Sequence, residues 1–351
     1  MDYSVAFAST LESYKWAIRA EELGFHCAWF YDTQLLNPDV FICMALAAHE
    51  THRIRLGTGV LVPSNRIAPV AANALASLNK LAPGRIDFGV GTGFTARRTM
   101  GQSAVPLKQT QRYIETVLAM LRGETTEWLD TDGPHKVRFL EPELGLINIE
   151  DDIPLWFSAF GPKAQQLTAD LCAGWLNFGS ANAEASLGAM RSLWRKAGHD
   201  ATRLQSNLFF LGAVLTGDQN VDNARLMAQA APLTSVMFHN MADAAGSMDT
   251  ANLDVGPLSD RLQAYLKIHE RYEPADARYL SNHKGHLMYV RPEETHITPE
   301  LARATTLSGT RDELITRLRG IRDAGYSQLT VQLVQGHESA IEDWAEVFAA
   351  V

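Results

Sequence analysis

The sequence predicts one α/β domain over residues 1–351, a (β/α)8 TIM barrel with a helical insertion late in the chain. Three observations favour this fold: the length of 351 residues, the alternation of strand-like with helix-like segments, and two successive strand–helix units in 54–93. The two strands of that segment lead into Gly57–Gly59 and Gly91–Gly93. Glycine leaves main chain uncovered, so these strand ends indicate a site for a flat or phosphorylated ligand.

Hydrophobic periodicity places the elements of the first half. Ser9 and Glu12 have the spacing of a capping box, which predicts a helix from there to Leu23 that Gly24 ends. The expected strands are Tyr3–Ala8, Cys27–Tyr31, a third beginning at Ile54 and a fourth over Arg85–Val90. The expected helices are Pro38–Glu50, Pro69–Asn79 and Leu107–Leu121.

The second half contains two departures from this alternation. Residues 124–152 are rich in acids, Gly and Pro, which predicts a loop excursion, and a helical insertion is expected over about 217–306, including the polar run Asp243–Gly256. The other expected strands are Pro154–Phe160, Trp175–Phe178, Asn207–Leu215 and Gln328–Val334. The expected helices run from Gly161 to Cys172, and over Ala183–Ala197, Arg311–Ala324 and Glu338–Ala350.

Composition excludes several classes of function. The net charge of −9 argues against sequence-independent binding to nucleic acid, which requires a basic surface. The apolar runs are shorter than a membrane-spanning helix, and residues 1–10 lack the basic start of a signal peptide, so we expect a cytoplasmic protein without membrane contact. Cys27, Cys43 and Cys172 are widely spaced, which indicates reduced thiols.

The strand ends that would form the barrel mouth are rich in glycine and poor in carboxylates. Asp32 and Gln34 end the second strand, and no nucleophile is accompanied by a base. Since side chains of this kind supply little reactivity of their own, a cofactor is expected to supply it. The strand ends that line this mouth are 8–10, 32–34, 57–63, 91–95, 160–163, 178–180, 215–217 and 335–337.

Two histidine pairs have a spacing seen in metal sites. His49 and His52 fall at the far end of a helix, on the wrong face of a barrel for catalysis. His283 and His286 lie in the insertion, where His286 is a candidate catalytic or substrate-contacting residue. No metal site is predicted from either pair.

Gly161–Lys163 opens a helix and is a candidate phosphate site. Free backbone N–H groups and the positive end of the helix dipole favour an anion there, and Lys163 adds a charge. A simple turn with proline at the first helical position explains the same residues, so both interpretations remain open. Gly91–Gly93 alone is a weak dinucleotide signal, since neither a third glycine nor an acid about twenty residues on completes it.

Four segments resemble the luciferase-like family of flavin-dependent barrels, in particular its branch of methylenetetrahydromethanopterin reductases and their bacterial relatives. These segments are Ile54–Gly93, Ala96–Gly101, Ile153–Trp175 and Leu307–Ala345. The resemblance implies a TIM barrel with a lid-like insertion, a flavin-type ring against the third strand, and a non-prolyl cis peptide at Gly59-Val60. The cofactor-binding residues that it implies are Thr58, Gly59, Val60, Gly91, Thr92, Gly93, Phe160, Gly161, Pro162 and Lys163.

The reaction type is open because this chain departs from the family pattern. Thr33 stands where related sugar-phosphate dehydrogenases carry histidine, and Thr92 where oxygenases tend to carry arginine. The resemblance implies a reduced flavin (FMN) or the deazaflavin coenzyme F420, used to oxidise or reduce a small organic substrate. Oxygen or a flavin reductase is a further expected partner, as is a second copy of the chain in a homodimer. The alternative is a non-catalytic flavin-binding protein on the same barrel.

Overall fold

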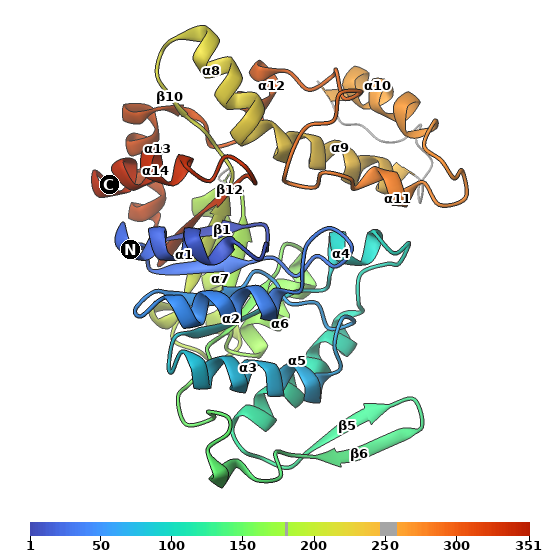
Figure 1. Ribbon diagram of the computed structural model, residues 1–351, viewed down its shortest axis with the longest axis vertical. Helices are drawn as coiled ribbons and strands as arrows, with labels where there is room; N and C mark the ends of the chain where they lie inside the picture. Colours follow the sequence, from blue (N-terminus) through green and yellow to red (C-terminus); the bar gives the residue numbers. More distant parts are fainter. Residues whose placement is uncertain (180–181, 246–257) are drawn as a thin grey trace. The chain divides into compact units, whose positions relative to one another are not determined.

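Eight parallel strands close into a barrel in the computed structural model, which describes residues 1–179, 182–245 and 258–351 (Figure 1). Their order around the barrel is β1-β12-β9-β8-β7-β4-β3-β2. The bounds are β1 Asp2–Phe7, β2 Cys27–Phe30, β3 Arg55–Thr58, β4 Ile86–Val90, β7 Leu155–Ser158, β8 Gly174–Phe178, β9 Ser206–Phe210 and β12 Gln328–Leu333. The predicted (β/α)8 barrel is therefore confirmed.

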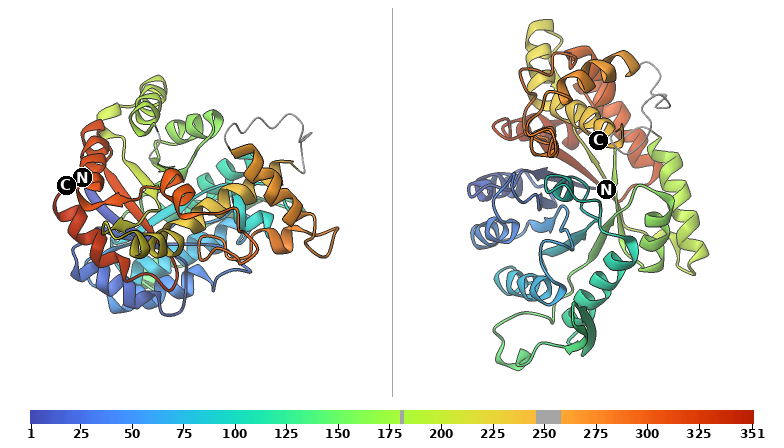
Figure 2. Two further views of the ribbon diagram at one scale, coloured as in Figure 1. Left: turned by 90° about the horizontal axis from the view of Figure 1, so that it is seen from above. Right: turned by 90° about the vertical axis from the view of Figure 1, so that its right-hand side faces the viewer.

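Helices connect most successive strands of the barrel, as a parallel sheet requires. Figure 1 shows α1, α2 and α3 side by side in chain order, and in Figure 2 they lie outside the strands. The connecting helices are α1 Ser13–Glu22, α2 Val40–Glu50, α3 Ala68–Leu81, α4 Phe94–Arg98, α5 Leu107–Leu121, α6 Pro162–Asp170 and α7 Ala183–Lys196. The last two helices, α13 Arg311–Ala324 and α14 Ala340–Ala349, match their predictions closely.

The chain divides into two compact units, which are described separately. Unit 1 comprises 1–96, 104–209 and 321–330, and unit 2 comprises 97–103, 210–320 and 331–351. The assignment of 1–351 to a single domain stays a prediction. Of the polar run Asp243–Gly256, residues 246–256 lie outside the described part of the chain.

Unit 2 contains the helices of the predicted insertion. They are α8 Gln219–Arg225, the π-helix η3 Leu226–Ala230, α9 Ala231–Ala245, α10 Ser259–His269, α11 Tyr279–Asn282 and α12 Pro299–Thr305. Buried apolar side chains from these helices, among them Phe238, Leu262 and Tyr265, form one core cluster. Removing such side chains from water is the main force that holds helices of this length together.

Tryptophan fills the interior of unit 1. Trp29 on β2 is fully buried and meets Trp156 and Phe209 edge-on, with ring centroids 5.8 and 5.6 Å apart. A Cβ at Gly57 would lie 2.4 Å from the Trp29 ring, closer than atoms pack. Gly57 is therefore required by the core, and its bare backbone does not by itself indicate a ligand.

Two local predictions were wrong. Ser9 does not cap α1: its hydroxyl donates to the Tyr31 carbonyl at 2.6 Å, and Glu12 occupies the cap position without a side-chain hydrogen bond. The expected strand Asn207–Leu215 is two strands, because Leu211 and Ala213 pair with 307–309. The second piece, β10 Val214–Leu215, pairs with β11 Gly309–Thr310.

The break between β9 and β10 has a steric cause. A Cβ at Gly212 would lie 1.9 Å from the Leu307 carbonyl oxygen, so only glycine permits this approach of two backbones.

The excursion 124–152 contains regular structure, an antiparallel hairpin of β5 Thr126–Asp130 and β6 Gly133–Val137, followed by the 3-10 turn η1 Pro142–Leu144. Few side chains of this hairpin are buried, which explains why its pattern resembles a loop.

Candidate active site

A hydrogen-bonded carboxylate lies at the carboxyl end of β2 in unit 1. Asp32 is 5% exposed and accepts hydrogen bonds from the Val62 N–H at 3.1 Å and the Asn65 amide at 3.0 Å. The Arg66 guanidinium approaches its other oxygen at 3.3 Å and also pairs with Asp39. The loop after β3 therefore folds around the carboxylate that ends β2.

Burial raises the pKa of Asp32 above its usual value, although Arg66 and the hydrogen bonds from Val62 and Asn65 oppose the shift. Burial, and secondarily the Asp32 charge, raises the pKa of Tyr113 on α5. The Tyr113 hydroxyl and the Asn65 Oδ1 atom are buried and have no partner among the described residues. Since buried polar atoms are nearly always paired, these two atoms indicate a place for a ligand or water.

Gln34 connects this carboxylate cluster to the end of the next βα unit. Its Oε1 atom accepts from the Asn65 amide at 2.8 Å, and its Nε2 atom donates to the Ala96 carbonyl at 2.5 Å. Gln34 is half-buried. Both predicted catalytic residues of the second strand thus belong to one network, and their catalytic role stays a prediction.

Main chain is accessible where β3 ends. Gly59 and Val60 are partly exposed and joined by a cis peptide bond, so that feature of the resemblance is confirmed. Thr58 is fully buried, and its hydroxyl donates to the Gly89 carbonyl at 2.6 Å. Any contact of Thr58 with a cofactor would therefore go through backbone. A Cβ at Gly91 would lie 2.8 Å from Val60 Cγ2.

Backbone conformation and a backbone hydrogen bond define the positions of Thr92 and Gly93. Gly93 has a φ of 80°, a conformation that favours glycine. Thr92 is half-buried and its carbonyl accepts from the Val105 N–H at 2.8 Å. These bonds keep Gly91–Gly93 in a fixed position beside Val60, but they do not test its predicted role in binding.

The amino terminus of α6 is open to solvent. Phe160, Gly161, Pro162 and Lys163 are all exposed, with Gly161 at the cap position and Pro162 at the first helical position. A Cβ at Gly161 would meet nothing within 4 Å. The first backbone N–H groups of a helix attract anions, so these residues fit a phosphate group beside Lys163.

His286 belongs to unit 2 and is half-buried. Burial lowers the pKa of His286 well below its usual value, and the nearby charges of His283 and His239 lower it further. Its imidazole is therefore neutral at physiological pH. His283 is hydrogen-bonded to Asp243 at 2.8 Å. In the described ranges, no group of three or more His, Cys, Asp or Glu side chains has the arrangement of a metal site. The catalytic role of His286 stays a prediction.

Three residues of the carboxylate cluster did not follow from the sequence. Asn65 and Arg66 lie just beyond the strand end 57–63, and their polarity in a mouth loop was the available signal. Tyr113 gave no signal, because it lies on the buried face of α5 with apolar neighbours. Its proximity to Asp32 depends on how α5 packs.

The comparisons with known proteins agree with this geometry. Residues 9–328 match the family model described as luciferase-like monooxygenase. The chain is 26% identical over 337 residues to the 5,10-methylenetetrahydromethanopterin reductase of Archaeoglobus fulgidus, covering 94% of this chain and 92% of the relative. The reductase of the same name from Methanolobus tindarius is 33% identical over 161 residues, 44% of this chain and less than half, 46%, of the relative.

Solved structures share the fold. The coenzyme F420 dependent tetrahydromethanopterin reductase from Methanopyrus kandleri superposes with a TM-score of 0.67 at 17% identity, covering 98% of this chain and 97% of that one. An oxygenating Baeyer–Villiger monooxygenase component from Pseudomonas putida, in complex with FMN, gives 0.62 at 13% identity, covering 99% and 95%. At these identities the likeness shows the fold alone.

Unit 1 has accessible backbone at the carboxyl ends of its barrel strands and a helix amino terminus that can bind an anion. These features are typical of cofactor-dependent barrel enzymes. The chain belongs to the luciferase-like monooxygenase family. The predicted class, an oxidoreductase that uses a flavin or a deazaflavin, is confirmed at that level, and its substrates are small molecules. None of the helices in the described ranges combines the length and apolarity needed to cross a bilayer.

Proposed function

We propose that the mouth of unit 1 binds the deazaflavin coenzyme F420 and that the chain transfers a hydride between this coenzyme and a small organic substrate. The full-length relative from Archaeoglobus fulgidus is by name a methylenetetrahydromethanopterin reductase, and further relatives are F420-dependent glucose-6-phosphate dehydrogenases from bacteria. The observation that carries the proposal is the accessible backbone of Gly59-Val60, combined with the open terminus of α6 in the same unit.

The coenzyme would supply the hydride chemistry, which no side chain of this cluster offers. Gly59 and Val60 would support one face of the ring, and Gly91 beside Val60 leaves no side chain in the way. Lys163 and the first N–H groups of α6 would hold the phosphate. The protein thus orients the ring and leaves one face open for a substrate.

Asp32 and Asn65 would act on the substrate side of the cluster. The Asn65 Oδ1 atom, buried and unpaired among the residues described, can accept a hydrogen bond from a ligand N–H or O–H. Asp32 holds the Asn65 amide group in the orientation that leaves this acceptor free.

A second candidate is oxygenation with reduced FMN, with oxygen as co-substrate and a flavin reductase as supplier. The family model, described as luciferase-like monooxygenase, favours it. Under this alternative, the same strand ends and helix terminus would hold FMN. A non-catalytic flavin-binding protein would use the same contacts without turnover.

We also propose a homodimer. Four leucines in the excursion 124–152 are more than half exposed. Covering such apolar side chains with a partner subunit lowers the free energy of the assembly. They are Leu129, Leu140, Leu144 and Leu146. Sedimentation equilibrium of the native chain checks this, and a monomer at micromolar concentration would exclude it.

Separate titrations with coenzyme F420 and with FMN test the proposed function. We expect F420 to bind at least about tenfold more tightly than FMN, a free-energy difference of about 1.4 kcal/mol. Hydride transfer is then followed by the absorbance of F420 with candidate alcohols, aldehydes and imines. Preferential binding of FMN, with oxygen consumption when FMN is reduced, would replace the first candidate by the second.

Lys163→Ala tests the phosphate contact, with Lys196→Ala on α7 as the matched control. Because Lys163 is exposed, we expect its loss to weaken coenzyme binding only about three- to tenfold. Riboflavin lacks the phosphate and should bind both variants equally. An effect of Lys163→Ala on riboflavin as large as that on FMN would place the phosphate elsewhere.

A further inference from the structure

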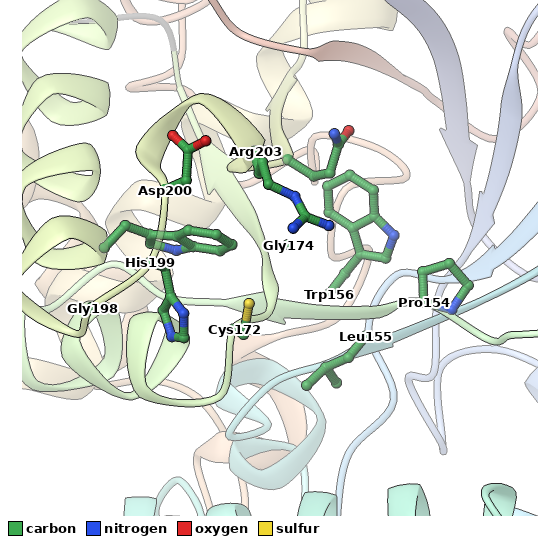
Figure 3. A pocket seen from close by; sticks show the side chains of 11 residues that line it. Pro154, Leu155, Trp156, Cys172, Gly174, Gly198, His199, Asp200 and Arg203 are labelled. Carbon is green, nitrogen blue, oxygen red and sulfur yellow. The ribbon is translucent and has the colours of Figure 1, made fainter.

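Unit 1 has a cavity of about 500 Å³ at the amino-terminal ends of β7, β8 and β9, away from the strand ends that carry Asp32 (Figure 3). It is formed by the segments that enter these three strands. The side chains that matter are those of Trp156, Cys172, Trp194, His199, Asp200 and Arg203. Small-molecule pockets have volumes of about 300–1,000 Å³, so this cavity has room for one ligand.

Two tryptophans form rigid apolar walls. Trp156 is 8% exposed, and its indole N–H donates to Asp87 at 3.0 Å. A Cβ at Gly174 would lie 2.5 Å from the Trp156 ring, so this ring lies directly on the β8 backbone. Trp194 is 4% exposed and packs against the His199 ring at 5.3 Å. Walls of this kind favour a flat apolar ligand.

The charged hydrogen-bond donor of this cavity is Arg203. The indole N–H of Trp194 is closed off from solvent and has no partner in the described part of the chain, so Trp194 contributes its ring and not a donor to the cavity. Asp200 also lines the cavity, and its Oδ1 atom accepts from the Thr202 N–H at 2.9 Å and hydroxyl at 2.8 Å. In Figure 3 the Arg203 guanidinium enters the space between Trp156 and Cys172, while the Asp200 carboxylate points away from it. A guanidinium that enters the cavity favours a negatively charged ligand.

We propose that this cavity is a binding site for a planar aromatic carboxylate. The ring lies against the tryptophan walls, and the carboxylate pairs with Arg203. This site is separate from the coenzyme site at the opposite strand ends and does not depend on the proposed function. A guanidinium binds a carboxylate through two parallel hydrogen bonds, whereas a neutral amide of the same shape cannot pair in this way.

Cys172 provides a local reporter of occupancy. Its thiol is exposed and points into the same space as Arg203 (Figure 3), whereas Cys27 and Cys43 are buried. A ligand in the cavity covers the Cys172 sulfur. Alkylation of this cysteine therefore measures binding at this site and is insensitive to binding at the barrel mouth.

The test follows alkylation of the native full-length chain by iodoacetamide, read by peptide mass spectrometry at Cys172. We expect saturating 2-naphthoate to slow this alkylation about tenfold or more, and 2-naphthamide at the same concentration to leave it unchanged. Arg203→Gln should raise the apparent dissociation constant for naphthoate about tenfold, and Trp194→Phe should raise it less. Arg195→Gln, an exposed arginine of α7 outside the cavity, is the matched control and should bind as the unmodified chain does.

Three results would overturn the proposal: no protection of Cys172 by naphthoate, equal protection by naphthoate and naphthamide, or protection that Arg203→Gln leaves intact. Circular dichroism of each variant establishes that it is folded. Because Arg203 is exposed, its substitution is not expected to unfold the chain, so loss of protection in that variant reports the lost charge pair.

Discussion

Asp32 shows at the scale of one residue how burial of a carboxylate affects stability. Its carboxylate is buried, and the pKa is raised despite Arg66, so the folded state holds the proton more tightly than the unfolded state. A raised carboxyl pKa favours folding at low pH, and this contribution is lost as the pH rises from the unfolded pKa through the folded one. At neutral pH the ionised carboxylate therefore costs stability.

Asp32→Asn should accordingly separate stability from activity. We expect the free energy of unfolding at pH 7 to be equal to or higher than that of the unmodified chain, measured by urea denaturation. Turnover should fall about ten- to a hundredfold in kcat/KM, because hydrogen bonds to a charged group contribute about 1.5–3 kcal/mol. Asp170→Asn, at an exposed position of α6, is the control and should change neither quantity. A destabilised but fully active Asp32→Asn variant would contradict this account.

At the scale of elements, the close approach of β3 and β4 depends on glycine. A Cβ at Gly89 would lie 2.0 Å from the Thr58 carbonyl oxygen and 3.1 Å from the Trp29 ring. The first contact is with backbone, which cannot rotate away. The mouth of the barrel keeps its shape because these two strands touch without a side chain between them.

Gly89→Ala should therefore destabilise the chain by about 1–3 kcal/mol or more in urea denaturation, the range of overpacked cores. Gly188→Ala is the matched control, since Gly188 is exposed on α7 and a Cβ there meets nothing within 4 Å. Alanine in a helix interior is more favourable than glycine by about 0.5–1 kcal/mol, so this control should be slightly more stable. Equal effects of the two substitutions would show that contact at Gly89 is relieved by small shifts.

Elements with a strong period followed from the sequence, and those shaped by a distant segment did not. The helix Leu107–Leu121 and the strand Cys27–Phe30 were predicted nearly to the residue, because one face of each pattern is apolar. The break after β9 depends on the Leu307 carbonyl, almost one hundred residues away, and no local pattern reports it. Ser9 had the spacing of a helix cap, but its hydroxyl donates to the carbonyl of Tyr31. The local sequence around Ser9 does not predict this contact with another strand end.

At the scale of the whole molecule, the alternation of strands and helices was sufficient to predict the barrel, and the site was predicted in part. Asp32 and Gln34 were predicted to lie at one mouth because strand ends meet there, and Asn65 bonds to both of them, but their catalytic role stays a prediction. Tyr113, whose pKa the Asp32 charge helps to raise, was not predicted, since a tyrosine on a buried helix face resembles core. The buried charge cluster of unit 2 was not predicted from the sequence either. In it, Arg291 and Glu294 form an ion pair at 2.7 Å, and His239 contacts Glu294 at 2.5 Å.

This charge cluster makes the stability of the chain depend on acid. Burial opposes ionisation of Glu294, but hydrogen bonds from His239 and Arg291 outweigh it and lower the pKa of Glu294 to about 2. A depressed carboxyl pKa stabilises the fold above the unfolded value of 4.5, and this contribution is lost as the pH falls from there toward 2. The pKa of His239 is lowered, chiefly by burial, so its protonation in acid also opposes the fold.

Glu294→Gln should remove this dependence. At pH 7 we expect it to cost about 3–5 kcal/mol in urea denaturation, because the Arg291 charge is left buried without its partner. The difference from the unmodified chain should shrink as the pH is lowered from 5 to 3, because the unfolded chain takes up a proton at Glu294 below pH 4.5 whereas the folded chain does so only near pH 2. Glu293→Gln is the matched control: its side chain is 44% exposed and 3.7 Å from Arg291, so the cost should stay below about 1 kcal/mol. A cost of Glu294→Gln that is the same at pH 3 and pH 7 would mean that the carboxylate charge contributes nothing and that the loss is one of packing.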